Sequence, residues 1–410
     1  MVSKEISTVK DLAIFGADPA FSQYKMVGVP NIGNRELLFS YINDILDRKW
    51  LTNNGKYVKE LEEKIRVMLG VKHAIAVANG TVGLEIAIRA TGMTSEVIVP
   101  SFTFVATAHA LSWQGIIPKF SDINRNTYTL DEEGIEKNIT EKTRGIIGVH
   151  VYGQPCNIDQ ISQIAREHNL SLIFDAAHAF GNSYKGRPIG NFGDAEIFSF
   201  HGTKFFNTFE GGAIVTNDDD IAEKCEYMRN FGLGNGEVSK YPGTNGKMNE
   251  VSAAMGLVNL ESIDEFVKIN KRNHMTYRRE LEGIQGINLL EYDEREKCNY
   301  QYAVIMIDEN SAGLNRDDIM RVLKAEGVQT RRYFFPGVHK MEPYKTMFPD
   351  MDKFLPITEM VTARVLALPT GTSVNDEEIE KISQIIRISV AHHKDVKAKL
   401  IRDYTNDSST

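Results

Sequence analysis

The chain has 410 residues, 42% of them hydrophobic, with a formal net charge of −8 at pH 7. A chain of this size buries a large core and has room for two domains, while its acidic balance argues against a nucleic-acid-binding surface. Cys156, Cys225 and Cys298 show no C-x-x-C spacing, so we expect neither a disulfide framework nor a metal site. The N-terminus is charged and no apolar run approaches the ~20 residues of a membrane span, which predicts a cytoplasmic protein without membrane contact.

In chain order, residues 1–30 are predicted to form an irregular N-terminal arm, because glycines and prolines interrupt them. Helical apolar spacing follows over residues 36–49 and 58–69. Short apolar runs, separated largely by helical patterns, then predict a mostly parallel sheet covered on both faces. These seven runs are 73–78, 96–100, 116–120, 145–151, 170–174, 195–200 and 212–216. We therefore expect a large α/β domain over residues 31–260.

The remainder of the chain is predicted to form a smaller α+β domain over residues 261–395. Proline is absent from residues 250–282 and apolar residues recur at helical spacing, which predicts one or two long linking helices. Residues 300–307 read as a strand, 317–326 as a helix, and 366–386 as strand, turn and helix. Residues 396–410 are expected to be a polar tail.

Two of the predicted strands end in residues with a chemical use. Asp175 closes the apolar run 171–174, and Lys204 lies in the turn after the run 195–200. Strand ends in an open α/β sheet are where ligands gather, so we expect these two side chains to converge. A lysine amine and a carboxylate suit pyridoxal phosphate, which needs an amine for its aldehyde and an anion beside its ring nitrogen. The alternatives are a surface lysine in a loop and an aspartate that caps a helix.

A phosphate site is indicated by the glycine turn at Gly80 and Thr81. A strand-like run precedes them and an apolar helical pattern follows, so free backbone N–H groups at a helix start would meet an anion there. Ser199, at a neighbouring strand end, would add a hydroxyl. Read alone, Asn-Gly-Thr is equally an ordinary turn with a helix cap.

Taken together, these motifs resemble the DegT/DnrJ/EryC1/StrS family of sugar aminotransferases, which have the fold of type I pyridoxal-phosphate enzymes. The resemblance covers roughly residues 28–390 and implies a seven-stranded sheet whose last strand runs antiparallel. Its motifs, in family order, are Trp50-Leu51-Thr52-Asn53-Asn54-Gly55, Pro100-Ser101-Phe102-Thr103-Phe104-Val105-Ala106-Thr107, Asp175-Ala176-Ala177-His178-Ala179, Ser199-Phe200-His201-Gly202-Thr203-Lys204 and Asn245-Gly246-Lys247-Met248-Asn249-Glu250.

The resemblance implies a role for each matching residue. Lys204 matches the lysine that forms a Schiff base with pyridoxal 5′-phosphate, and Asp175 matches the partner of the ring nitrogen. The other matches are Gly80, Thr81 and Ser199 at the phosphate, Phe104 stacked on the ring, His178 near the ring hydroxyl as in viosamine-type enzymes, Asn245 reaching the phosphate from the second subunit of a homodimer, and Thr52, Asn53, Arg331 and Tyr333 near substrate. His178 and Phe104 also read as core residues, and Asn245 as a turn residue.

The reaction implied is transfer of an amino group from glutamate, through pyridoxamine 5′-phosphate, to a nucleotide-linked 4-keto-6-deoxyhexose. A dTDP carrier and amination at C4 come from the resemblance alone, as does a role in O-antigen, another surface polysaccharide or an antibiotic. The alternatives are a 3-keto-sugar aminotransferase, a sugar 3-dehydratase and an inactive regulatory paralogue. Lys204 disfavours the dehydratase, which carries histidine at that position.

Overall fold

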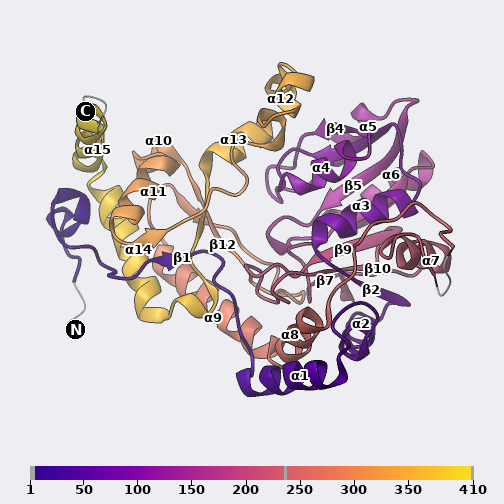
Figure 1. Ribbon diagram of the computed structural model, residues 1–410. Helices are drawn as coiled ribbons and strands as arrows, with labels where there is room; N and C mark the ends of the chain where they lie inside the picture. The colour runs from indigo at the N-terminus through magenta and orange to yellow at the C-terminus, as the bar shows by residue number, and fades with distance from the viewer. Residues whose placement is uncertain (1–4, 235–237, 408–410) are drawn as a thin grey trace.

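The structure is a computed structural model that describes residues 5–234 and 238–407, and it has two lobes, each built on a sheet (Figure 1). The larger lobe holds the seven-stranded sheet, and the smaller lobe holds a three-stranded one. The first and the last described residues of the chain lie at the smaller lobe (Figure 1). No helix in the described ranges is long and apolar enough to cross a membrane.

The seven-stranded sheet confirms the predicted fold class. Its strands lie in the order β2-β10-β9-β6-β5-β3-β4, and β10 is antiparallel to both neighbours while the other pairs are parallel. The bounds are β2 His73–Val77, β3 Glu96–Pro100, β4 Ile117–Ser121, β5 Thr143–Val149, β6 Ser171–Asp175, β9 Ala195–Ser199 and β10 Gly212–Thr216.

Helices cover both faces of this sheet, which explains why its strands are largely apolar. Along β10, Ala213 and Val215 belong to one core cluster and Ile214 to another, as the alternation of side chains across a strand requires. The first cluster packs beneath α1 Arg35–Arg48, α2 Lys56–Leu69, α5 Glu132–Asn138, α6 Ile158–Glu167 and α8 Glu250–Glu261. The second packs beneath α3 Gly80–Ala90, α4 Ala106–Ser112 and α7 Asp219–Met228.

The smaller lobe has its own core and an antiparallel sheet in the order β11-β12-β14. The long helix α9 follows α8 and carries the chain from one lobe to the other, as expected from the proline-free stretch (Figure 1). The elements are α9 Ile263–Leu281, β11 Ile287–Leu289, β12 Ala303–Ile307, α10 Glu309–Ala312, α11 Arg316–Ala325, β13 Val328–Gln329, α12 Tyr344–Met347, α13 Pro356–Arg364, β14 Val365–Leu368, α14 Asp376–Ala391 and α15 His393–Asp407.

The two ends of the chain are more ordered than their composition suggested. In the N-terminal arm, Leu12 and Phe21 are buried in the core of the smaller lobe, and β1 Lys25–Met26 pairs with β13. At the other end, α15 runs to Asp407 where a polar tail was expected from residue 396, because Val396 and Leu400 pack one helical turn apart into the same core. Residues 1–4 of the arm and 408–410 of the tail lie outside the described residues.

Candidate active site

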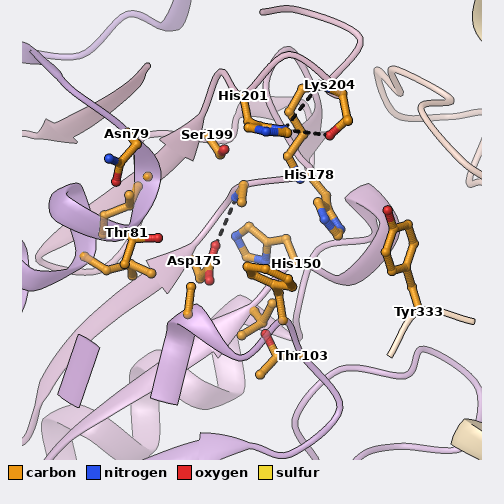
Figure 2. Close-up of a pocket in the computed structure, with 18 of the residues that line it drawn as sticks. Asn79, Thr81, Thr103, His150, Asp175, His178, Ser199, His201, Lys204 and Tyr333 are labelled. Atoms are coloured by element: carbon orange, nitrogen blue, oxygen red, sulfur yellow. Dashed lines mark hydrogen bonds between the residues drawn. The ribbon is translucent and has the colours of Figure 1, made fainter. Parts of the chain in front are cut away.

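One cavity of about 560 Å³ opens at the carboxyl ends of the central strands of the large sheet. In Figure 2, Asn79 and Thr81 lie at one side of it and Tyr333 at the other, with Asp175 between them. The lining residues predicted from the sequence are Gly80, Thr81, Phe104, Asp175, His178, Ser199, Lys204 and Tyr333. The structure therefore brings eight of the twelve predicted site residues to one cavity.

Asp175 is the last residue of β6, and its carboxylate is buried against the cavity. Oδ2 accepts a hydrogen bond from the Thr107 hydroxyl at 2.8 Å, and Oδ1 accepts one from the Ala177 N–H at 3.1 Å. Burial raises the pKa of the Asp175 carboxyl, while these two donors and the nearby Lys204 amine oppose that rise. A buried carboxylate with oriented oxygens is suited to hold a protonated ring nitrogen.

Lys204 follows β9 in a tight turn in which its backbone N–H donates to the His201 carbonyl at 2.8 Å. Burial lowers the pKa of the Lys204 amine to about 8, and the negative charge of Asp175 acts against that fall. The neutral form of the amine is therefore far more populated near physiological pH than in an ordinary lysine. A neutral amine is the form that attacks a carbonyl carbon.

The opposite end of the cavity is formed by the start of α3. The Asn79 side chain caps this helix by accepting from the Val82 N–H at 2.9 Å. The N–H groups of Gly80 and Thr81 belong to the first turn and have no acceptor inside the helix. A Cβ on Gly80 would lie only 3.0 Å from Cβ of Ser199, so the glycine lets the helix start approach the end of β9. Helix N–H groups beside the two hydroxyls of Thr81 and Ser199 make an anion site.

His178 is buried, and both of its ring nitrogens have partners. Nδ1 accepts from the Tyr152 N–H at 3.1 Å, so the neutral ring carries its proton on Nε2, which lies 3.2 Å from the Tyr302 hydroxyl oxygen. Burial and the charge of Lys204 hold the pKa of His178 well below its usual range, so the ring is neutral. The histidine is thus a fixed hydrogen-bond donor in the wall of the cavity.

Four predicted site residues do not line this cavity within a single chain. Asn53 lines a second cavity near Lys247, and Thr52 is exposed with its hydroxyl bonded to Asn53. Asn245 is exposed and forms a backbone bridge with Asn230, while Arg331 is exposed and forms one with Ala367. Their roles toward cofactor and substrate remain predictions.

The structure also adds residues that sequence reasoning missed, among them His150, Tyr302 and Phe334. His150 follows β5 and is fully buried. Its Nδ1 accepts from the Cys156 N–H at 3.1 Å, and its Nε2 has no hydrogen-bond partner in the described part of the chain. His150 lay inside the predicted run 145–151, whereas the observed strand ends at Val149, so a polar residue near the end of an apolar run was the available signal. Tyr302 and Phe334 come from the smaller lobe and gave no such signal.

These groups fit pyridoxal phosphate, since a neutral amine, a buried carboxylate and an anion-binding helix end surround one cavity. Phe104, 59% exposed at the edge of the cavity, offers an aromatic face to a flat ring. The described residues contain no cluster of three or more histidine, cysteine or acidic side chains able to hold a metal ion.

Comparisons with known proteins point in the same direction. A model described as the DegT/DnrJ/EryC1/StrS aminotransferase family matches residues 33–387. The dTDP-4-amino-4,6-dideoxy-D-glucose transaminase of Escherichia coli is 36% identical over 87% of this chain and 96% of that protein. The GDP-perosamine synthase of Escherichia coli O157:H7 is 33% identical over 89% and 98%. The structure of DesI with its TDP-sugar product has 44% identity and a TM-score of 0.91 over 96% of this chain and 99% of that one.

Proposed function

The chain belongs to the DegT/DnrJ/EryC1/StrS aminotransferase family, and we propose that it transfers an amino group to C4 of a dTDP-linked 4-keto-6-deoxyhexose. It is a pyridoxal-phosphate enzyme of the nucleotide-sugar class. The cofactor, when bound, supplies an electron sink beside the carbon that loses or gains a proton. The sugar and its carrier follow from the names of the E. coli relative and of the DesI complex.

The observation that carries this proposal is the convergence of Lys204 and Asp175 in one cavity, with the amine pKa lowered to about 8. Lys204 holds the cofactor and then moves a proton to and from the reacting carbon. Asp175 faces the ring nitrogen. A lysine at this position also separates a transferase from a sugar 3-dehydratase, which needs no amine there.

The remaining lining residues are assigned by the chemistry of their groups. The N–H groups of Gly80 and Thr81, with the hydroxyls of Thr81 and Ser199, hold the phosphate. The Nε2–H of His178, which lies 3.2 Å from the Tyr302 hydroxyl oxygen, would lie beside the ring hydroxyl, and Phe104 would stack on the ring. Tyr333, at the far side of the cavity, contacts the sugar nucleotide.

We further propose glutamate as the donor and a homodimer with shared sites. Lys204 is the only lysine or arginine among the described residues that line the cavity, whereas Asp175 and Glu210 are both acidic. The N–H groups of Gly80 and Thr81 are assigned to the cofactor phosphate, so Lys204 is the one cationic side chain left on the described wall for the carboxylates of glutamate and for a diphosphate. A second copy of the chain that brings Asn245 to the cavity would supply one further amide donor.

The proposal is tested with purified protein and a panel of dTDP-, UDP- and GDP-linked keto sugars. Glutamate should remove the visible absorbance band of the lysine-bound cofactor, and the accepted sugar nucleotide should restore it. Mass spectrometry and NMR of the product then report whether the amine is on C4 or C3. A protein whose band resists both borohydride and glutamate, or full turnover by Lys204→Ala, would contradict the proposal.

A further inference from the structure

A buried chain of hydrogen bonds joins the end of β3 to the segment of the smaller lobe that reaches the cavity. Ser101 follows β3 directly, and its Oγ accepts from the His339 N–H at 3.0 Å. The same Oγ lies 2.6 Å from Nδ1 of His339, and the Val338 N–H donates to the Ser101 carbonyl at 3.0 Å. His339 in turn lies 2.8 Å from Oε1 of Glu359 on α13.

The protons in this chain can be assigned. The Glu359 carboxylate also binds the Lys340 ammonium and acts only as an acceptor, so Nε2 of His339 carries a proton. Burial lowers the pKa of His339 despite the opposing charge of Glu359, which keeps the ring neutral and leaves Nδ1 as an acceptor. The Ser101 hydroxyl therefore donates to Nδ1 while it accepts the backbone N–H. The side-chain polar groups of Ser101, His339 and Glu359 therefore all have partners.

Serine, histidine and glutamate are also the residue types of a hydrolytic triad, but this arrangement excludes that use. Ser101 is 0% exposed and His339 only 2%, so no substrate reaches the hydroxyl. Neither residue lines the cavity. Their role is therefore positional.

The chain holds two walls of the cavity together. Thr103 and Phe104, just after Ser101, line the cavity from the large lobe, and Tyr333 and Phe334, just before His339, line it from the smaller one. Between these pairs the Phe102 ring packs edge-on against Phe334, with ring centres 5.5 Å apart. The hydrogen bonds of Ser101 with Val338 and His339 therefore set the spacing between these two walls.

We propose that the Ser101–His339–Glu359 chain is a positioning device that sets the affinity for the sugar nucleotide by fixing Tyr333 and Phe334. This rests on the proposed function, because it assigns Tyr333 and Phe334 to the sugar side of the site. Lys204 and the start of α3 belong to the large lobe and make no hydrogen bond to this junction in the described part of the chain. Asp175 is linked to the residues after Ser101 through the hydroxyls of Thr107 and Thr103. The helices α12 and α13 extend from the smaller lobe toward α4, which places the junction between the lobes (Figure 1).

The test compares Ser101→Ala, His339→Ala and His339→Asn in the full chain. One lost hydrogen bond is worth roughly tenfold, so we expect KM for the sugar nucleotide to rise about tenfold in Ser101→Ala and more in His339→Ala. His339→Asn keeps an acceptor near the position of Nδ1 and should recover part of the loss. The glutamate half-reaction should stay within about twofold of wild type in all three.

The matched control is Tyr344→Phe. Tyr344 is equally buried in the same segment, and its hydroxyl contacts His109 and Ser112 of the large lobe at 2.8 and 3.1 Å, away from the cavity. It should leave KM for the sugar nucleotide unchanged. An equal fall in both half-reactions, or the same rise in KM for the control, would overturn the proposal.

Hydrogen exchange gives a readout that does not depend on turnover. The amides of Gly337, Val338 and His339 should exchange faster in Ser101→Ala than in wild type, whereas those of α3 should not. If wild type turns over no nucleotide keto sugar, the proposed function fails, and the exchange rates still decide whether the junction holds the segment. Unchanged exchange at all three amides would refute the positioning role.

Discussion

The backbone N–H of Tyr152 donates to Nδ1 of His178 at 3.1 Å and so fixes which ring nitrogen of His178 carries the proton. Tyr152 adopts a left-handed backbone with φ of 56°, and its hydroxyl donates to the Tyr333 carbonyl of the other lobe. One tyrosine thus orients a cavity histidine with its backbone and ties the two lobes with its side chain. Side-chain substitutions at 152 and 178 therefore separate the two functions.

We expect His178→Gln to retain much of the cofactor affinity, because its amide still offers a donor near the position of Nε2. His178→Phe keeps a flat ring but no donor, and its cofactor affinity should fall roughly tenfold, the worth of one buried hydrogen bond. Titration of apoprotein with pyridoxal 5′-phosphate, followed by fluorescence, measures both. Tyr152→Phe leaves the backbone N–H in place and serves as the control. It removes the hydrogen bond to the Tyr333 carbonyl and should not lower the cofactor affinity tenfold. Equal affinities for the Gln and Phe variants would contradict a donor role.

Acid should destabilise the protein from about pH 6.5 downward, the range of an ordinary histidine. Burial lowers the pKa of His150 in the folded protein to about 3. Between that value and pH 6.5, His150 is therefore protonated in the unfolded chain and neutral in the folded one. Stability then falls by up to about 1.4 kcal/mol per pH unit for this group as the pH drops toward its folded pKa. His150→Phe, which keeps the stack on Phe174, should flatten that slope. Chemical denaturation at several pH values measures it, and an unchanged slope would argue against the assignment.

Cofactor loading should depend on pH through Lys204. The neutral amine is the reactive form and its pKa lies at about 8, so the loading rate of the apoprotein should rise with pH and level off above that value. The charge of Asp175 raises the Lys204 pKa, so Asp175→Asn should move the rise to lower pH. Stopped-flow absorbance gives both curves. A midpoint near the value of a free lysine, or no shift in Asp175→Asn, would contradict this reading.

Sequence reasoning found those parts of the site that follow a local pattern. Asp175 ends one apolar strand and Lys204 lies in the turn that follows another, and strand ends of a parallel sheet meet at one edge. Tyr302 and Phe334 were not predicted as site residues, because the contact of the smaller lobe with the large one depends on packing between segments more than a hundred residues apart. The order of the N-terminal arm was missed for a similar reason. Leu12 and Phe21 pack into the core of the smaller lobe, but the arm has no helical or strand-like spacing of apolar residues. Asn245 stays a prediction because a second chain would have to place it, and Thr52 stays one because it does not line the cavity.

The close approach of Gly80 to Ser199 predicts a selective loss in Gly80→Ala. The added Cβ would meet Cβ of Ser199 at 3.0 Å, which pushes the start of α3 away from β9. We expect cofactor affinity to fall while the protein stays folded, since the strain falls on the anion site. Gly202→Ala is the control, because its Cβ would meet its nearest neighbour at 3.4 Å, an ordinary contact. A comparable loss of cofactor affinity in both variants would show that the close contact with Ser199 is not the cause.

Glu250 stabilises the fold from within the large lobe. Its buried carboxylate accepts from the N–H groups of Tyr57 and Val58 at 3.2 and 2.9 Å and so caps α2, a helix whose N-cap residue, Gly55, has no side chain. Removing the carboxylate in Glu250→Ala leaves two buried donors unpaired, at a cost of about 2–4 kcal/mol in the free energy of unfolding.

Glu250→Gln separates the contribution of charge from that of the hydrogen bonds. Its amide oxygen still accepts one of the two N–H groups, so the loss should be about half that of Glu250→Ala. Denaturant titration of the two variants against wild type gives the order. Because α2 packs on the sheet face away from the start of α3, the cofactor affinity of folded Glu250→Gln should match wild type. A large loss of affinity at unchanged stability would instead assign Glu250 to the site.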